Sequence, residues 1–83
     1  MEKILLKKDF FESSDLSLVS ALQLHGYQIE AMDRNNPDKV IFVIRRNEGL
    51  DNLIQAFWSR SLKVEPLAYF ESMKSIKARL YQQ

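Results

Sequence analysis

The amino-acid sequence predicts a small α+β domain in which helices pack on a central antiparallel hairpin. Three observations predict this class: helical stripes of apolar residues, an alternating segment followed by an all-apolar one, and a length of 83 residues, which allows one core. The expected order along the chain is helix, strand, strand, helix, a short strand and a final helix. We therefore expect residues 1–83 to form a single domain.

The N-terminal segment, residues 1–13, has lysines early and two phenylalanines late, without a clear period. The alternatives for this segment are an extended N-terminal arm and an edge strand. Residues 4–7 are the candidate for such a strand.

The first helix is expected over residues 14–25. Ser13, Ser14 and Asp15 are all good N-caps, because their side-chain oxygens accept hydrogen bonds from the free N–H groups of a first turn. Apolar residues then recur on one helical face. Gly26 follows, at the position where a residue of left-handed conformation ends a helix at low cost.

An antiparallel hairpin is expected over residues 27–46. Residues 27–34 alternate between apolar and polar side chains, which is typical of a half-buried strand. The sequence Asn-Asn-Pro-Asp follows at 35–38 and predicts a loop of about four to five residues. Residues 40–44 are consecutive β-formers, which predicts a strand covered on both faces. Either helices of this chain lie on both faces, or a second copy or a protein partner covers one of them.

The second helix has the strongest pattern and is expected from about residue 47 or 48 to residue 59 or 60. Its apolar residues form one broad stripe, which predicts a buried face: Leu50, Leu53, Ile54, Phe57 and Trp58. Trp58 is therefore expected in the core. An exposed tryptophan would instead suit stacking on a nucleic-acid base.

Residues 62–64 are the candidate short third strand, and Glu65-Pro66 opens the last helix, since proline at the first helical position loses no hydrogen bond. We expect this helix to run to about residue 81. Its expected apolar arc consists of Tyr69, Phe70, Met73, Ile76 and Leu80. Lys77 falls inside that arc, so it either snorkels past its neighbours or contacts a partner.

Six short motifs follow one another along the chain. They are Asp15-Leu16-Ser17-Leu18, Gly26-Tyr27, Val40-Ile41-Phe42-Val43, Phe57-Trp58, Leu62-Lys63-Val64 and Lys77-Ala78-Arg79-Leu80-Tyr81. This series, over roughly residues 10–81, resembles a family of short bacterial and phage proteins classed as a domain of unknown function. The glycine usual in that family before Leu-Lys-Val is replaced by Arg60-Ser61, which leaves the geometry of the turn open. The resemblance implies a small accessory role in a phage or mobile-element setting, and it brings no known activity and no catalytic residues.

Composition excludes several classes of function. The chain has no cysteines, one histidine and two glycines, which excludes disulfides, thiolate or multi-histidine metal sites and glycine-rich phosphate loops. No apolar run is long enough to span a membrane and no signal peptide is visible, so we expect a soluble, cytoplasmic protein. We expect no cofactor, no small-molecule substrate and no membrane contact.

No group of side chains has the arrangement that catalysis requires, and we expect a non-enzyme. His25 lies at a helix end, where a packed side chain that favours the helix dipole is the simplest interpretation. Asp9, Glu12 and Asp15 recur at three-residue steps, and a solvated helix entrance explains them better than a metal site. We therefore expect no bound metal.

The charge is polarised along the chain, although the net charge is only +1. Residues 1–38 hold four basic and seven acidic residues, whereas residues 60–83 hold five basic and two acidic residues. A basic helix with tyrosines suits contact with a phosphate backbone. The candidate binding residues are Arg45, Arg46, Arg60, Lys63, Lys74, Lys77, Arg79 and Tyr81.

The sequence thus favours a small accessory domain of a phage or mobile element that contacts nucleic acid through its basic C-terminal helix, within a larger nucleoprotein assembly. The alternative is a protein-interaction or self-association module without nucleic-acid contact. In that case the same helix binds an acidic protein partner or a second copy. Phosphate contact makes binding strongly dependent on salt, which distinguishes the two hypotheses.

Overall fold

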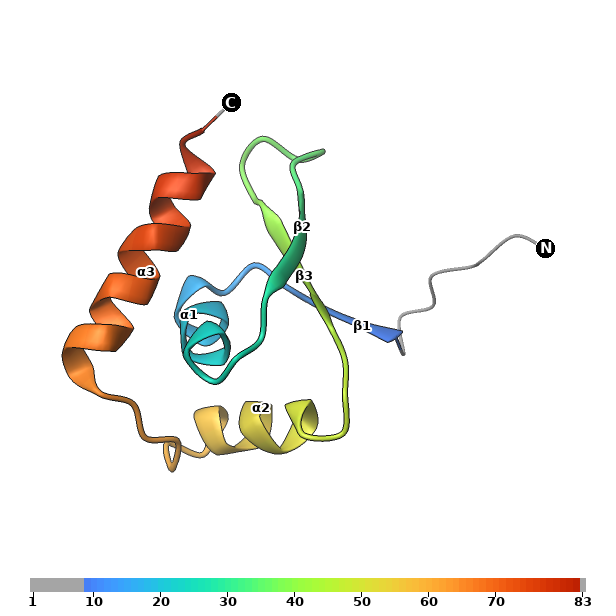
Figure 1. Cartoon of the computed structure of the whole chain (residues 1–83). Coiled ribbons are helices and arrows are strands. Elements are labelled where there is room, and N and C mark those ends of the chain that lie inside the picture. Colours follow the sequence, from blue (N-terminus) through green and yellow to red (C-terminus); the bar gives the residue numbers. More distant parts are fainter. Residues whose placement is uncertain (1–8, 83) are drawn as a thin grey trace.

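Three strands and three helices make up the part of the chain that the structure, a computed structural model, describes: residues 9–82. They are β1 (Phe10–Ser13), α1 (Leu16–Leu24), β2 (Ile29–Asp33), β3 (Ile41–Arg45), α2 (Leu50–Trp58) and α3 (Pro66–Leu80). The expected α+β class, with an antiparallel hairpin packed by helices, is confirmed (Figure 1).

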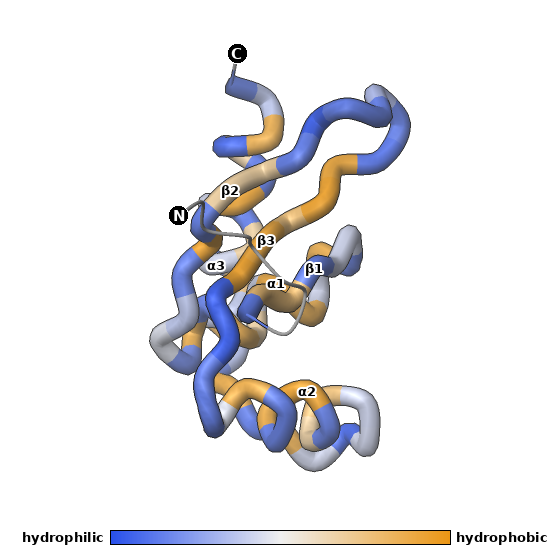
Figure 2. The backbone as a smooth tube through the Cα atoms, turned by 90° about the vertical axis from the view of Figure 1, so that its right-hand side faces the viewer, coloured by the Kyte–Doolittle hydropathy of each residue, from blue (hydrophilic) through white to orange (hydrophobic). Residues whose placement is uncertain are grey.

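The sheet is antiparallel, with β3 at its centre in the order β1-β3-β2. Phe11 of β1 and Ile29 of β2 both lie opposite Ile44 of β3. The register of β2 shifts between Ile29 and Ala31, as a β-bulge does. In Figure 2 the central strand is a largely hydrophobic segment that leads from a hydrophilic hairpin loop.

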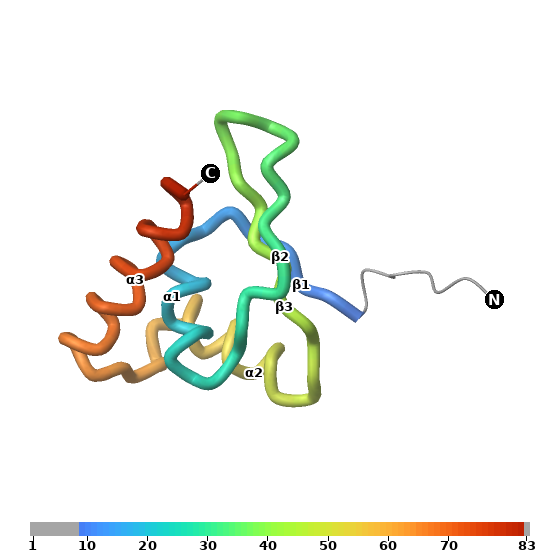
Figure 3. Tube along the Cα trace, turned by 45° about the horizontal axis from the view of Figure 1, so that its top comes forward, coloured from blue at the N-terminus to red at the C-terminus, as the bar shows by residue number. Residues whose placement is uncertain are grey.

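The helices form two further layers beside the sheet. α1 lies between the sheet and α3, and α2 lies across one end of α1 (Figure 1). Figure 3 shows the same order of layers from another direction. Because α1 has neighbours on opposite sides, residues 18–22 are all buried. α2 adds Leu50 to the core and α3 adds Ile76, both with no exposed surface.

The two faces of the sheet have different surroundings. Phe42 and Ile44 of β3 face the helices and are buried. Ile41 and Val43 alternate with them, lie on the opposite face and are half-buried. Among the described elements, the helices therefore cover one face of the sheet.

The helix ends follow signals in the sequence. Asp15 caps α1 by accepting a hydrogen bond from a first-turn N–H group at 3.1 Å. Gly26 ends the same helix with a φ of 96°, which is the left-handed conformation expected of it. Glu65 caps α3 by accepting from two backbone N–H groups, and Pro66 takes the first position. These expectations are confirmed.

The expected order of elements needs two corrections, so that the observed order is β-α-β-β-α-α. The first element described is the edge strand β1, which agrees with one of the two alternatives for residues 1–13 but lies at residues 10–13, while the candidate strand at residues 4–7 lies outside the described residues. Residues 62–64 form no strand, because the Leu62 N–H donates to the Ala56 carbonyl of α2 at 3.1 Å, which folds the chain back onto that helix. The β2–β3 loop, residues 34–40, is also longer than expected.

The expectation that Trp58 is buried is wrong, since 61% of its surface is exposed. Leu50 centres the buried face of α2, and Trp58 lies about 80° around the helix from it at 100° per residue. Trp58 is thus at the edge of the apolar stripe and in the last residue of the helix. Its ring contacts Phe57 edge to face, with centroids 5.0 Å apart.

The expected buried arc of α3 is also rotated relative to the observed one. Phe70 was expected inside and is 56% exposed, whereas Ser72 is buried. The Ser72 hydroxyl donates to the Ser20 carbonyl of α1 at 3.0 Å, so two small residues lie where the two helices approach each other. Since Phe70 faces outward, Lys77 lies on the exposed side of α3 and does not snorkel from a buried arc.

Candidate nucleic-acid interface

Five residues of the C-terminal helix form a line along its exposed side, which we name the α3 outer stripe. They are Leu67, Phe70, Lys74, Lys77 and Tyr81. They alternate in steps of three and four residues, and this spacing keeps them on one side of a helix. Tyr81 is the C-cap residue and completes the last turn.

The large apolar side chains of this stripe are exposed to solvent. The exposed fractions are 62% for Leu67, 56% for Phe70 and 78% for Tyr81. With Trp58, these are the large hydrophobic side chains that are exposed among the described residues. Three of these four side chains therefore share one side of α3, which marks that side as a candidate contact surface.

The two lysines of the stripe lie between its two aromatic residues. The Lys74 ammonium is 5.4 Å from the centre of the Phe70 ring, within the range of a cation–π contact. The stripe itself contains no acidic residue. Glu71, the acidic residue within α3, is exposed at the edge of the stripe, four residues after Leu67 and three before Lys74. Two lysines against this one carboxylate leave a local charge of +1, with the lysines toward the C-terminal end of the helix.

Contacts on the other side of α3 hold the stripe in place. The Tyr69 hydroxyl donates to the Ser17 carbonyl of α1 at 3.0 Å, and Ile76 is fully buried. At the C-terminal end, the Arg34 guanidinium donates to the backbone carbonyls of Leu80 and Arg79 at 3.0 and 2.9 Å. The Arg79 carbonyl also accepts from the Gln82 N–H at 3.2 Å, so Arg34 adds a second donor there and supplies a donor to the Leu80 carbonyl, which makes it a side-chain cap of α3.

Arg79 does not belong to the outer stripe. It follows Lys77 by two residues, which places it about 200° around the helix. Arg79 lines a polar hollow of about 430 Å³ together with residues of the α1–β2 connection: Gln23, Gly26, Tyr27, Gln28 and Ile29. It shares a second, smaller hollow with Arg34, Met32 and Gln82.

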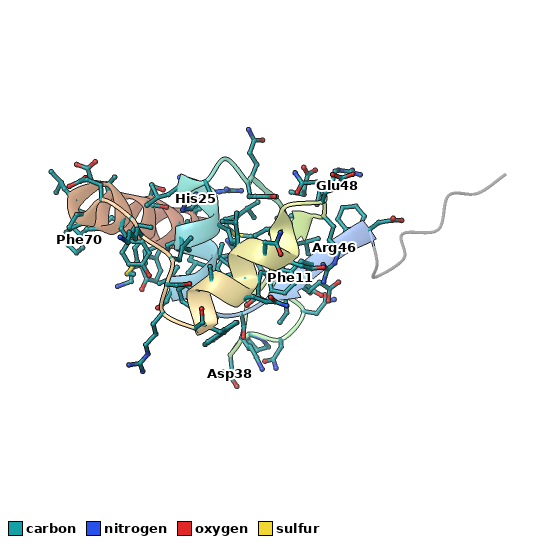
Figure 4. All side chains as sticks on the ribbon, turned by 90° about the horizontal axis from the view of Figure 1, so that it is seen from below. Phe11, His25, Asp38, Arg46, Glu48 and Phe70 are labelled. Carbon is teal, nitrogen blue, oxygen red and sulfur yellow. The ribbon has the colours of Figure 1, made fainter. Side chains whose placement is uncertain are left out.

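Arg46 lies at the other end of the molecule from Phe70 (Figure 4), and Arg45 directly precedes it as the last residue of β3. Arg45 lies 4.9 Å from the centre of the Phe10 ring, and Arg46 lies 5.6 Å from that of Phe11. Arg46 also pairs with Asp51 at the start of α2, so local contacts account for both arginines.

Arg60 and Lys63 lie in the connection between α2 and α3, and both are exposed. Arg60 has a φ of 66°, the left-handed region that a glycine would normally occupy. The turn therefore contains a left-handed residue, Arg60, although the glycine that is usual here in the resembling family is missing.

Of the eight residues expected at a binding site, the structure thus brings three into one line: Lys74, Lys77 and Tyr81. Sequence reasoning missed Leu67 and Phe70, because it assigned Phe70 to the core. It also missed Arg34, whose hydrogen-bond partners lie 45 and 46 residues further along the chain. No local pattern indicates such a long-range cap, whereas Ser72, a small residue just outside the expected arc and four residues before Ile76, was a usable signal for the orientation of α3.

Residues 9–82 contain no group of three or more His, Cys, Asp or Glu side chains that could hold a metal ion. His25 is the C-cap of α1 and is exposed. Among the helices described, none combines the length and the apolar character that crossing a membrane would require.

A family model described as "Domain of unknown function (DUF5659)" matches residues 8–82 of the chain. The search of curated proteins and the search of solved structures give no match.

Proposed function

The chain belongs to the family of the domain of unknown function DUF5659, and we propose that it is a small non-catalytic accessory domain that contacts nucleic acid through the α3 outer stripe. The resemblance of its motifs to short bacterial and phage proteins supports a setting in a larger nucleoprotein assembly of a phage or mobile element. The proposed contact residues are those of the stripe, with lysines for phosphates and aromatic rings for bases.

The observation that carries this proposal is the interleaving of exposed aromatic rings with cations on one side of α3. Phe70 and Tyr81 are each more than half exposed, and Lys74 and Lys77 lie between them in the sequence. Aromatic faces can stack on bases, and ammonium groups can neutralise phosphates, so both parts of a nucleotide find a complement here.

The outer face of the sheet favours a second candidate function, protein contact or self-association. Ile41 and Val43 are half-buried on the face that the described helices leave uncovered. An apolar sheet face of this kind can bind another protein surface. It lies on a different part of the molecule from the stripe, so the two candidates can be tested separately.

The test of the proposal is fluorescence anisotropy with labelled single-stranded and duplex DNA and RNA over a range of salt concentrations. We expect Lys74→Gln and Lys77→Gln each to weaken binding and to reduce the magnitude of the salt slope by about 0.7 to 0.9, because each lysine neutralises one phosphate. Lys39→Gln removes the same charge from the β2–β3 loop and serves as the matched control. Equal losses in all three variants would assign binding to overall charge and contradict a contact at the stripe.

A further inference from the structure

The spacing of the two aromatic residues suits a ligand that is extended along the helix. Tyr81 follows Phe70 by eleven residues, which is about 16 Å along a helix axis at 1.5 Å per residue. Lys74 and Lys77 lie about 6 and 10 Å from Phe70 on the same scale. A ligand along the stripe would therefore meet an aromatic ring, two cations and a second aromatic ring in turn.

The chemistry of the stripe does not suit the reading of a duplex. Base edges in the major groove are read mainly by arginine, lysine, asparagine and glutamine, and of these residue types the stripe contains only its two lysines. The faces of paired bases are covered by their neighbours in the stack, so Phe70 and Tyr81 would find no ring to stack on. A single strand presents both base faces and phosphates.

The small number of cations in the stripe also favours a single strand over a duplex as the ligand. Two lysines would give a salt slope of about −1.4 on a single strand, which is a weak electrostatic contribution. Stacking on exposed aromatic rings supplies further affinity without reading the sequence of bases. A ligand that uses both the rings and the lysines therefore gains more at this stripe than a ligand that uses charge alone.

Pairing of α3 with a second copy of itself is disfavoured by the same side chains. In an antiparallel pair along the stripe, the central residue Lys74 would face its own copy, and Leu67 would face Tyr81. Like charges placed opposite each other at the centre of an interface oppose association. The stripe is therefore better suited to an anionic ligand than to its own copy.

From these observations we infer that the α3 outer stripe binds single-stranded nucleic acid, with bases stacked on Phe70 and Tyr81 and phosphates at Lys74 and Lys77. This inference rests on the proposed function and adds the strandedness of the ligand and a division of labour among the residues. The rings recognise a single strand, and the lysines bind any phosphate backbone.

The decisive variants are Phe70→Leu and Tyr81→Leu, which keep an apolar side chain and remove the aromatic face. Anisotropy is measured on a mixed-sequence single-stranded DNA and on the duplex made from it. We expect each variant to weaken single-strand binding by about tenfold, the scale of one lost stacking contact. Duplex binding should stay the same. Trp58→Leu is the matched control, since it removes an exposed ring outside the stripe.

A thermal melt of each variant shows whether it is folded. If one of the two leucine variants fails to fold, the other still tests the inference. Duplex binding equal to or tighter than single-strand binding would overturn the inference while leaving the proposed function in place. Unchanged single-strand binding in both leucine variants would also overturn the inference and leave the proposed function in place. No binding to either form would overturn both, and a protein partner would then be the better explanation of the exposed stripe.

Discussion

Arg60 holds a backbone conformation that suits glycine better than arginine. It occupies the position after the C-cap of α2, with a φ of 66°, and the next N–H, from Ser61, bonds back to the Ala56 carbonyl at 2.9 Å. This geometry is the usual glycine ending of a helix, and a side chain with a Cβ atom is strained there. The cost is local, because the side chain of Arg60 is exposed.

We therefore expect Arg60→Gly to raise the free energy of unfolding by about 0.5–1 kcal/mol, the relief of strain being partly offset by the greater freedom of glycine in the unfolded chain. Denaturant unfolding followed by circular dichroism measures the change. Ser59→Gly is the control, since Ser59 has a φ of −83° and gains no relief. A lower stability of Arg60→Gly than of the parent would mean that the arginine side chain makes a stabilising contact larger than the strain.

At the scale of single elements, the C-terminal end of α3 depends on a side chain from the hairpin. Arg34 follows β2 and donates to two of the last carbonyls of α3, at Arg79 and Leu80. A guanidinium group can reach two acceptors at once and also favours the negative end of the helix dipole. This contact fixes the last turn, in which Lys77 and Tyr81 of the outer stripe lie.

Replacing Arg34 by lysine should loosen this turn, because one ammonium group does not match the fork of the guanidinium. We expect Arg34→Lys to cost about 1 kcal/mol, which is about 4–8 °C in the melting temperature of a domain of this size. Amide hydrogen exchange should become faster in residues 78–82 and stay the same in α2. Lys39→Arg, in the same loop, is the control for a change between two cations. An unchanged exchange rate at the end of α3 would show that Arg34 is not its cap.

The range of the interactions that shape each element explains which elements could be predicted from the sequence. Caps act between residues a few positions apart, so Asp15, Gly26 and Glu65 gave correct helix ends. The orientation of α3 was mispredicted because a count of large apolar residues omits Ser72, whose small size and hydroxyl fit the contact with α1. Leaving Ser72 out of the buried face led to two wrong predictions, that Phe70 is buried and that Lys77 lies among buried residues.

At the scale of the whole molecule, the position of α1 between the sheet and α3 makes the three layers depend on one another. Ser20 shows how close the fit is, since its hydroxyl is fully buried without a hydrogen-bond partner among the described residues, while its carbonyl accepts from Ser72 of α3. The candidate site also depends on how the three layers pack together. Lys74 and Lys77 were recognised from charge, whereas their grouping with Leu67 and Phe70 follows from how α3 packs, which no single segment of sequence specifies.

Removing α3 should therefore unfold the molecule and not merely abolish binding. A chain that ends at Val64 loses Ile76 from the core and exposes the side of α1 that faces α3, including Ser20 and its neighbour Ala21, both now buried. A small domain has a narrow margin of stability, so the loss of one layer should exceed it. We expect no cooperative thermal transition by circular dichroism and increased binding of a hydrophobic dye.

A chain that ends at Leu80 is the control, because it keeps α3 and loses Tyr81, and it should melt cooperatively while binding nucleic acid less tightly. A cooperative melt of the shorter chain near the parent temperature would show that α3 is an appendage to an independent core.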